Sequence, residues 1–210
     1  MRKLKLSIGI IALVFVALSF TSCKDAKKEN TNEDGHHTEA GHDNSDGHHD
    51  GDNTSASNTR DIEANDQKIE TTSPIIDAYI QIKNGLVADS KENAAKGAGA
   101  LLKAFSQFDM TALTGNIHNE YMEILESAKE HAEHIVKSPI DHQREHFEVL
   151  STDINDLIAL LGTEKTLYKD FCPMANNNKG AYWLSEIKDI KNPYFGSKMM
   201  KCGSVKEQIN

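Results

Sequence analysis

Soft sulfur side chains are concentrated in about the last forty residues of the chain. Cys172 and Met174 lie two positions apart, and Met199, Met200 and Cys202 follow roughly thirty residues later. Thiolate and thioether ligands select Cu(I) and related soft ions over hard cations. These residues therefore predict a metal site, with Cu(I) as the expected ion and other soft or borderline metals as alternatives.

The same spacing allows a disulfide. In extended segments Cys172 and Met174 project from one face, as do Met200 and Cys202. If the two segments paired antiparallel, Cys172 would lie opposite Cys202 and Met174 opposite Met200. Such a pairing would gather four sulfur atoms, and it would equally suit a Cys172–Cys202 disulfide, worth about 3–4 kcal/mol in the chain-entropy model. Metal binding, a disulfide and simple core packing all stay open, as does the choice between Met199 and Met200.

Four histidines flank one predicted tight turn between two helices: His131, His134, His142 and His146. Their spacings of three and four residues place the members of each pair on neighbouring helical turns. His146 is expected at the rim of the buried face, where it could meet the C-terminal segment, whereas His134 is expected to point away from its own apolar stripe. Singly each would be a surface or capping residue; together they are candidate metal ligands.

Half of the ten histidines lie in one polar, acidic stretch: His36, His37, His42, His48 and His49. Short histidine-rich tracts bind Zn, Cu(II) or Ni, and flexible ligands give weak, labile capture. The alternative is a polar spacer. Residues 24–72 carry thirteen acidic and five basic side chains and no aromatic residue. We expect residues 23–72 to be a disordered tether, and the absence of a basic stripe argues against nucleic-acid binding.

The N-terminus resembles a bacterial lipoprotein signal. A basic start and an apolar run precede Thr21-Ser22-Cys23. We expect residues 1–22 to be a signal peptide and Cys23 to be lipidated. The protein would then be exported and membrane-anchored through lipid, facing the periplasm or exposed at the cell surface.

Helical periodicity begins at Ser73-Pro74, a capping hydroxyl followed by an N-terminal proline. Further helices are expected from near Ser90, over Asn119–Lys137, and from a cap at Ser138, with Pro139 as the first helical residue, to a stop at Gly162. The pattern predicts a mainly α protein, an antiparallel four-helix bundle over residues 73–162. Residues 163–210 should form a loop-rich segment with short β strands, packed on the bundle as part of one domain.

Two strands are expected in that segment, over Thr166–Phe171 and Ala181–Leu184, with a loop at Asn176–Gly180 and a turn at Asn192–Gly196. No nucleophile elbow, phosphate loop, haem motif or zinc-protease motif is present. We therefore expect no enzymatic activity.

Several short motifs together resemble an uncharacterised domain of Bacteroidetes-type organisms, found as stand-alone lipoproteins and at the C-terminus of copper/silver efflux adaptor subunits. The resemblance covers roughly Ile75 to Val205. It implies a periplasmic domain connected with copper handling, with a heavy-metal efflux adaptor as a partner, and it favours Met199 over Met200. The motifs are Gln143–Phe147, Phe171–Ala175, Gly180–Trp183, Asn192–Gly196, and Met199 with Cys202-Gly203.

The predicted function is that of an exported lipoprotein that binds copper or another soft heavy metal, for sequestration or hand-over to an efflux or resistance system. The alternative is a disulfide-stapled protein-interaction module of an efflux complex, without a specific metal site.

Overall fold

The computed structural model describes residues 60, 62 and 72–210, which all belong to one compact unit, Thr54–Asn210. The predicted signal peptide, Cys23 and the five tether histidines lie outside the described residues. Within the described part, no helix combines the length and apolar character needed to cross a membrane.

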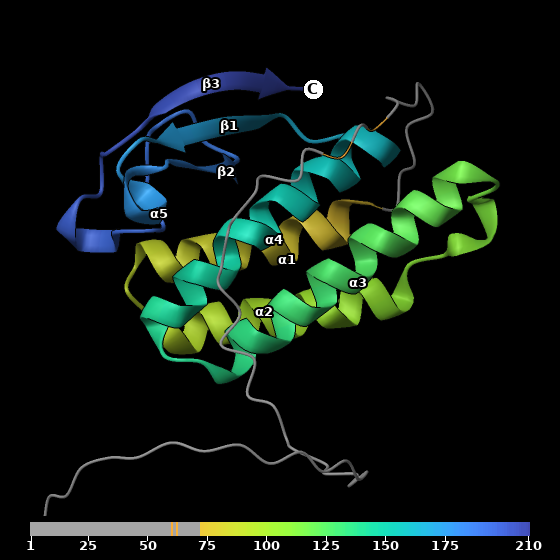
Figure 1. Ribbon diagram of the computed structural model, residues 1–210, viewed down its shortest axis with the longest axis horizontal. Coiled ribbons are helices and arrows are strands. Elements are labelled where there is room, and N and C mark those ends of the chain that lie inside the picture. The colour runs from red at the N-terminus through yellow and green to blue at the C-terminus, as the bar shows by residue number, and fades with distance from the viewer. Residues whose placement is uncertain (1–59, 61, 63–71) are drawn as a thin grey trace, which may run out of the picture. The chain divides into compact units, whose positions relative to one another are not determined.

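Four long helices form the bundle that the periodicity predicts (Figure 1). Each packs against the next along the chain, and α1 also contacts α4. They are α1 Ser73–Val87, α2 Lys91–Gln107, α3 Asn116–Lys137 and α4 Ile140–Leu161. The mainly α fold class is thereby confirmed.

The ends of the helices follow local chemistry. The Ser90 side chain caps α2 by accepting a hydrogen bond from the backbone N–H of Asn93 at 3.3 Å. Gly162, with φ of 79°, ends α4. The helix α3 begins at Asn116, three residues before the predicted start at Asn119. The preceding Gly115, with φ of 61°, fixes that start.

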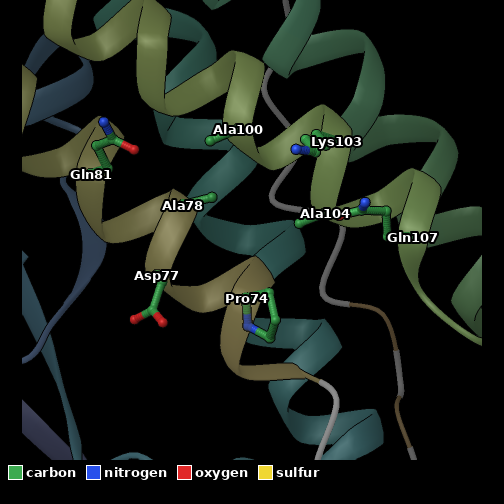
Figure 2. Close-up of a pocket in the computed structure, with 8 residues that line it drawn as sticks. All are labelled: Pro74, Asp77, Ala78, Gln81, Ala100, Lys103, Ala104 and Gln107. Atoms are coloured by element: carbon green, nitrogen blue, oxygen red, sulfur yellow. The ribbon is translucent and has the colours of Figure 1, made fainter.

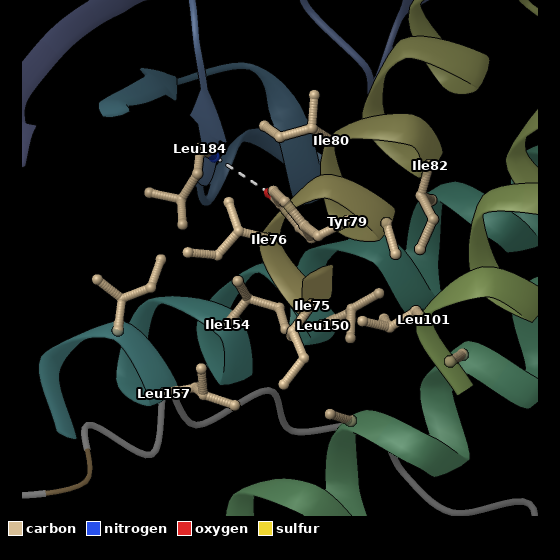
Figure 3. Packing of buried hydrophobic residues seen from close by; sticks show 14 of the residues in the cluster. Ile75, Ile76, Tyr79, Ile80, Ile82, Leu101, Leu150, Ile154, Leu157 and Leu184 are labelled. Atoms are coloured by element: carbon tan, nitrogen blue, oxygen red, sulfur yellow. Dashed lines mark hydrogen bonds between the residues drawn. The ribbon is translucent and has the colours of Figure 1, made fainter. Parts of the chain in front are cut away.

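The core of the bundle is built from the inward stripes of all four helices (Figure 3). The ring of Tyr79 in α1 stacks on Phe147 in α4 with centroids 5.1 Å apart. Aliphatic side chains such as Ile76, Leu101 and Ile154 are fully buried around them. Burial of this kind supplies most of the stability of a helical bundle.

A three-stranded antiparallel sheet follows the bundle, with strand order β2-β1-β3. Strands β1 (Leu167–Cys172) and β2 (Ala181–Ser185) match the two predicted strands. The third, β3 (Ser204–Ile209), is an addition to them. Short helical segments connect the strands: α5 Ala175–Asn178 and the 3-10 helix η3 Gly196–Lys198, while the 3-10 helix η2 Met110–Ala112 precedes α3.

The sheet packs on α1 and α4 mainly through its edge strand β2 (Figure 1). Trp183 and Leu184 are buried. The Leu184 backbone N–H donates to the Tyr79 hydroxyl at 3.1 Å (Figure 3), and that hydroxyl lies 2.8 Å from Ser151 Oγ. This buried hydrogen-bond network fixes the C-terminal segment to the bundle.

Two residues of the predicted tether contact the bundle. The Arg60 guanidinium binds the carboxylates of Asp153 at 2.8 Å and Asp156 at 3.2 Å, and Ile62 packs against the core. Ser127 Oγ donates to the other oxygen of Asp153 at 2.7 Å. The folded part therefore makes contacts as far back as residue 60.

Candidate metal centre

Four imidazole rings meet between α3 and α4, where a tight turn joins the two helices. His146 lies at the centre of this histidine cluster. Its Nδ1 atom is 2.9 Å from Nδ1 of His131, and its Nε2 atom is 3.0 Å from Nε2 of His142. The ring of His134 stacks on that of His146 with centroids 4.3 Å apart. The structure thus brings the four predicted residues together.

The turn at Ser138-Pro139 explains why the rings meet. The helix α3 ends at Lys137, where the Ser138 backbone N–H donates to the His134 carbonyl at 3.0 Å, and α4 begins three residues after Lys137, at Ile140. Each helix places two histidines within its two turns nearest this turn. Because α3 and α4 run antiparallel side by side, the two histidine pairs lie at the same level along the helix axes.

Three of the rings offer nitrogen atoms that could hold one ion. The ligand atoms of His134, His142 and His146 all lie within 4.8 Å of one another. A tetrahedral ion with metal–nitrogen bonds of about 2.0–2.1 Å has ligand atoms about 3.3 Å apart. The Nε2 atoms of His142 and His146, at 3.0 Å, are close to that separation. His134 is exposed, so its ring can rotate to complete the set.

The outward nitrogens of two of these rings are already engaged. Nδ1 of His142 lies 2.6 Å from a carboxylate oxygen of Glu145, one helical turn away. Nδ1 of His146 faces Nδ1 of His131. Metal-ligating histidines almost always place the second ring nitrogen against such a partner, which fixes the tautomer and the ring orientation.

The cluster favours neutral imidazole, the form that binds metals. Burial, reinforced by the neighbouring imidazoles of His134, His131 and His142, lowers the pKa of His146 to about 4. Burial likewise lowers the pKa of His131, although Asp153 and Glu130 oppose the shift. These two rings are therefore uncharged near neutral pH.

The two sulfur residues Cys172 and Cys202 also meet, at the far side of α4. Both are free cysteines; Cys172 is buried and Cys202 half-buried. Strand β1 ends at Cys172 and β3 begins at Ser204, so strand pairing does not include Cys202. The thiols interact beyond the strand ends. Burial and hydrogen bonding with Cys172 raise the pKa of Cys202 to about 11, so its thiol is protonated at neutral pH.

The methionines are placed less tightly. Met174 precedes α5 and its side chain is 47 % exposed. Met199 and Met200 are half-buried, and the backbone carbonyl of each accepts a hydrogen bond. The Met199 carbonyl accepts from the Cys202 N–H at 3.0 Å, and that of Met200 accepts from the Asn192 N–H at 2.9 Å. The predicted opposition of Met174 and Met200 across paired strands does not form, because Met174 lies beyond the end of β1.

The histidine cluster and the sulfur residues occupy different sides of α4. Arg144 donates to the Pro193 carbonyl at 3.0 Å, and Glu148 accepts from Asn176 at 2.7 Å, so these two positions face the C-terminal segment. His146 lies about 200° around the helix from either, at 100° per residue. Within the described residues, the hydrogen bonds and ring contacts of the cluster join its members to each other and to Glu145. The expected meeting of His146 with the C-terminal segment does not occur.

A separate hollow of about 290 Å³ lies between α1 and α2 (Figure 2). Small side chains at Ala78, Ala100 and Ala104 leave this groove open, and polar side chains surround it. None of its lining residues is a predicted ligand. The lining is Pro74, Asp77, Ala78, Gln81, Ala100, Lys103, Ala104 and Gln107.

The fold and the cluster together define a small α-helical domain, capped by a three-stranded sheet, that carries a histidine centre between two antiparallel helices. Residues 75–166 match the model of a family described as "Protein of unknown function (DUF3347)". This part of the chain is thus similar to a domain of uncharacterised function. The match includes all four clustered histidines and ends just before β1, so the sulfur residues lie outside it. No curated protein and no solved structure matches the chain.

Proposed function

We propose that this protein is an exported lipoprotein whose bundle binds a transition-metal ion at His134, His142 and His146. The carrying observation is that three ring nitrogens lie within 4.8 Å of one another. The contact between Nδ1 of His142 and the Glu145 carboxylate adds support, because metal-ligating histidines commonly have such a partner on the second ring nitrogen.

The proposed biological role is capture of copper or a related metal, for sequestration or hand-over to an efflux or resistance system. The signal-like N-terminus supports export, and the histidine-rich tether supports collection of ions near the membrane. The resemblance to domains attached to copper/silver efflux adaptors supports an adaptor as the receiving partner.

The thiols supply a second ligand set suited to Cu(I). Cys172 and Cys202 lie close enough to interact, with the Met174 backbone beside them. Binding there must displace a thiol proton, because the ligand is the thiolate. Cu(I) titration of the reduced mature chain against a chromophoric chelator tests this set. Retention of Cu(I) that is lost in Cys172→Ser and Cys202→Ser supports it, and equal retention in both variants rejects it.

The experiment that tests the proposal separates the cluster from the tether. The mature chain is prepared with Cys23→Ser and with His36, His37, His42, His48 and His49 replaced by Ser. We expect this tether-substituted protein to retain one equivalent of divalent metal by mass spectrometry of the metal content after desalting. Adding His142→Ala and His146→Ala should abolish it. A tether-substituted protein that holds no metal would refute the proposed centre.

A further inference from the structure

We infer that the histidine cluster takes a borderline divalent ion, of the Zn(II) and Cu(II) class, on three imidazoles, and leaves a fourth coordination position open to an exchangeable ligand. This inference rests on the proposed function and specifies the cargo of the same site. Its inner ligands are Nε2 of His142, Nε2 of His146 and one ring nitrogen of His134.

The choice of nitrogen atoms follows from what each ring already contacts. Glu145 engages Nδ1 of His142 at 2.6 Å, so that ring must donate its Nδ1–H outward and offer Nε2. His131 engages Nδ1 of His146 at 2.9 Å, which leaves Nε2 of His146 for the ion. The two Nε2 atoms already face each other at 3.0 Å. An ion between them needs only a small separation of the two rings.

The class of ion follows from the donor types. Imidazole nitrogen suits Zn(II), Cu(II) and Ni(II), whereas Mg(II) and Ca(II) require oxygen ligands. Among the described residues, Glu145 supplies the carboxylate that hydrogen-bonds to the cluster, and His142 already holds it. The thiols lie on the opposite side of α4, so no soft sulfur ligand from that pair reaches the cluster. Selection therefore favours borderline divalent ions over both hard cations and Cu(I).

The open position follows from the role of the fourth histidine. Nδ1 of His131 is directed at Nδ1 of His146 and not at the space between the Nε2 atoms. His131 is thus an outer partner that orients His146. His134 and His142 are exposed, so the fourth position faces solvent. Zinc sites with three protein ligands keep such a position for water or substrate. A solvent-facing open position lets a partner's ligand enter before the ion leaves.

The test uses the tether-substituted mature chain and four probes: Zn(II), Cu(II), Cu(I) and Mg(II), each in competition with a chelator of known affinity. We expect one tight equivalent of Zn(II) or Cu(II), and no retention of Mg(II). Cu(I) retention should disappear with Cys172→Ser and be unaffected by His142→Ala. For the Cu(II) form, added imidazole should shift the electron paramagnetic resonance spectrum as it enters the fourth position.

A matched pair of variants tests the outer partner. Glu145→Gln removes the carboxylate from His142 and should weaken Zn(II) binding about 10–100-fold. Glu133→Gln makes the same charge change on an exposed residue of α3 beside the cluster and should leave affinity within about two-fold. Both apo proteins should melt at similar temperatures, because Glu145 is exposed.

The outcomes separate the two levels of the proposal. Failure of every ion to bind overturns the proposed function itself. Cu(I) or Mg(II) held by the cluster in place of a divalent borderline ion overturns this inference and leaves metal binding standing. An imidazole-insensitive Cu(II) spectrum overturns the open position, and equal affinities of the Glu145→Gln and Glu133→Gln variants overturn the assigned outer partner.

Discussion

At the scale of single residues, the most unusual environment after the histidine cluster is that of Asp170 in β1. Its side chain is fully buried, and among the described residues neither carboxylate oxygen has a hydrogen-bond partner. Burial raises the pKa of Asp170 to about 7, while attraction to Lys83 opposes the shift. Lys83 is itself buried on α1, and desolvation lowers its pKa. The interface between the sheet and the bundle therefore contains a carboxyl group that stays protonated in the folded protein up to a pH of about 7.

This environment predicts a pH dependence of stability. The folded state holds the Asp170 proton up to pH of about 7, whereas the unfolded chain releases it near its ordinary pKa of about 3.9. The contribution of Asp170 to stability is thus fully present below pH of about 3.9 and is lost as pH rises to about 7. The Asp170→Asn variant has no carboxyl group to titrate at this position. The free energy of unfolding of the wild type, relative to that of the variant, should therefore be lower at pH 8 than at pH 5. Urea unfolding at both pH values measures it.

The exposed Asp189→Asn is the control for that experiment, because it removes one carboxyl group without removing a buried one. Its stability relative to the wild type should be the same at both pH values. Equal behaviour of the two variants would mean that Asp170 is ionised in the folded protein at pH 5.

Residue types and spacing predicted the histidine cluster but not its connections. Two pairs around one turn can be found in the sequence, because helix periodicity fixes their relative positions. The contact between Glu145 and His142 could also have been predicted from the sequence, because the two residues are spaced three apart on the surface of one helix. The burial of Asp170 could not have been predicted, because a charged residue in a strand carries no local signal of which face it occupies. The sequence expectation that His134 points away from the core is consistent with its exposure, yet its stacking on His146 depends on how α3 and α4 pack.

At the scale of elements, amphipathic periodicity predicted the helices and missed the last strand. Strand β3 carries only Val205 and Ile209 as apolar residues, and both are half-buried. It is an edge strand, held by backbone pairing with β1. Backbone hydrogen bonds leave little pattern in the side chains. The start of α3 was placed late because its first turn carries a single apolar residue, Ile117, among polar ones, although Ile117 packs against the core.

The contact between α1 and α2 depends on glycine. A Cβ added at Gly97 would lie 2.6 Å from the backbone nitrogen of Ile82, and backbone cannot move aside as a flexible side chain can. We expect Gly97→Ala to lower the free energy of unfolding by about 1–3 kcal/mol, since overpacking strains the helix contact. Urea denaturation followed by circular dichroism measures the change.

Gly99, two residues further along α2, is a matched control. A Cβ there meets nothing within 4 Å. Gly99→Ala should therefore raise the free energy of unfolding by about 0.5–1 kcal/mol, because alanine restricts the unfolded chain and favours helix. If both variants stabilise the protein, α1 and α2 do not approach closely enough at Gly97 for a Cβ to meet the Ile82 backbone.

At the scale of the whole molecule, α4 separates the histidine cluster from the thiols of the C-terminal segment. One side of it meets α3 and carries His142 and His146; the other, through Arg144 and Glu148, holds the C-terminal segment with its thiols. The imidazoles and the thiols thus lie on opposite sides of α4, and no residue belongs to both sets. Imidazole nitrogens and thiolates prefer ions of different softness, so the metal binding proposed above would involve different ions at the two sets.

The same helix also anchors the N-terminal side of the chain through Arg60, which is 93 positions from Asp153 and 96 from Asp156. Both carboxylates are buried, whereas the Arg60 side chain is 30 % exposed. Without the guanidinium, the buried carboxylates of Asp153 and Asp156 would each lose their ion-pair partner. Desolvation already raises the pKa of both acids against the opposing effect of Arg60.

Arg60→Gln is therefore expected to lower the free energy of unfolding by about 1–3 kcal/mol, the range for a buried acceptor that loses its partner. Lys165→Gln removes a more exposed ion pair, that of Lys165 with Asp77 at 2.7 Å, and should cost less than about 1 kcal/mol. Asp153→Asn combined with Arg60→Gln should cost less than the two single changes added together, because each single change leaves a partner behind. Chemical denaturation of the four variants forms the test. Additive effects, or a cost for Arg60→Gln no larger than that for Lys165→Gln, would mean that the segment at residue 60 does not dock on α4.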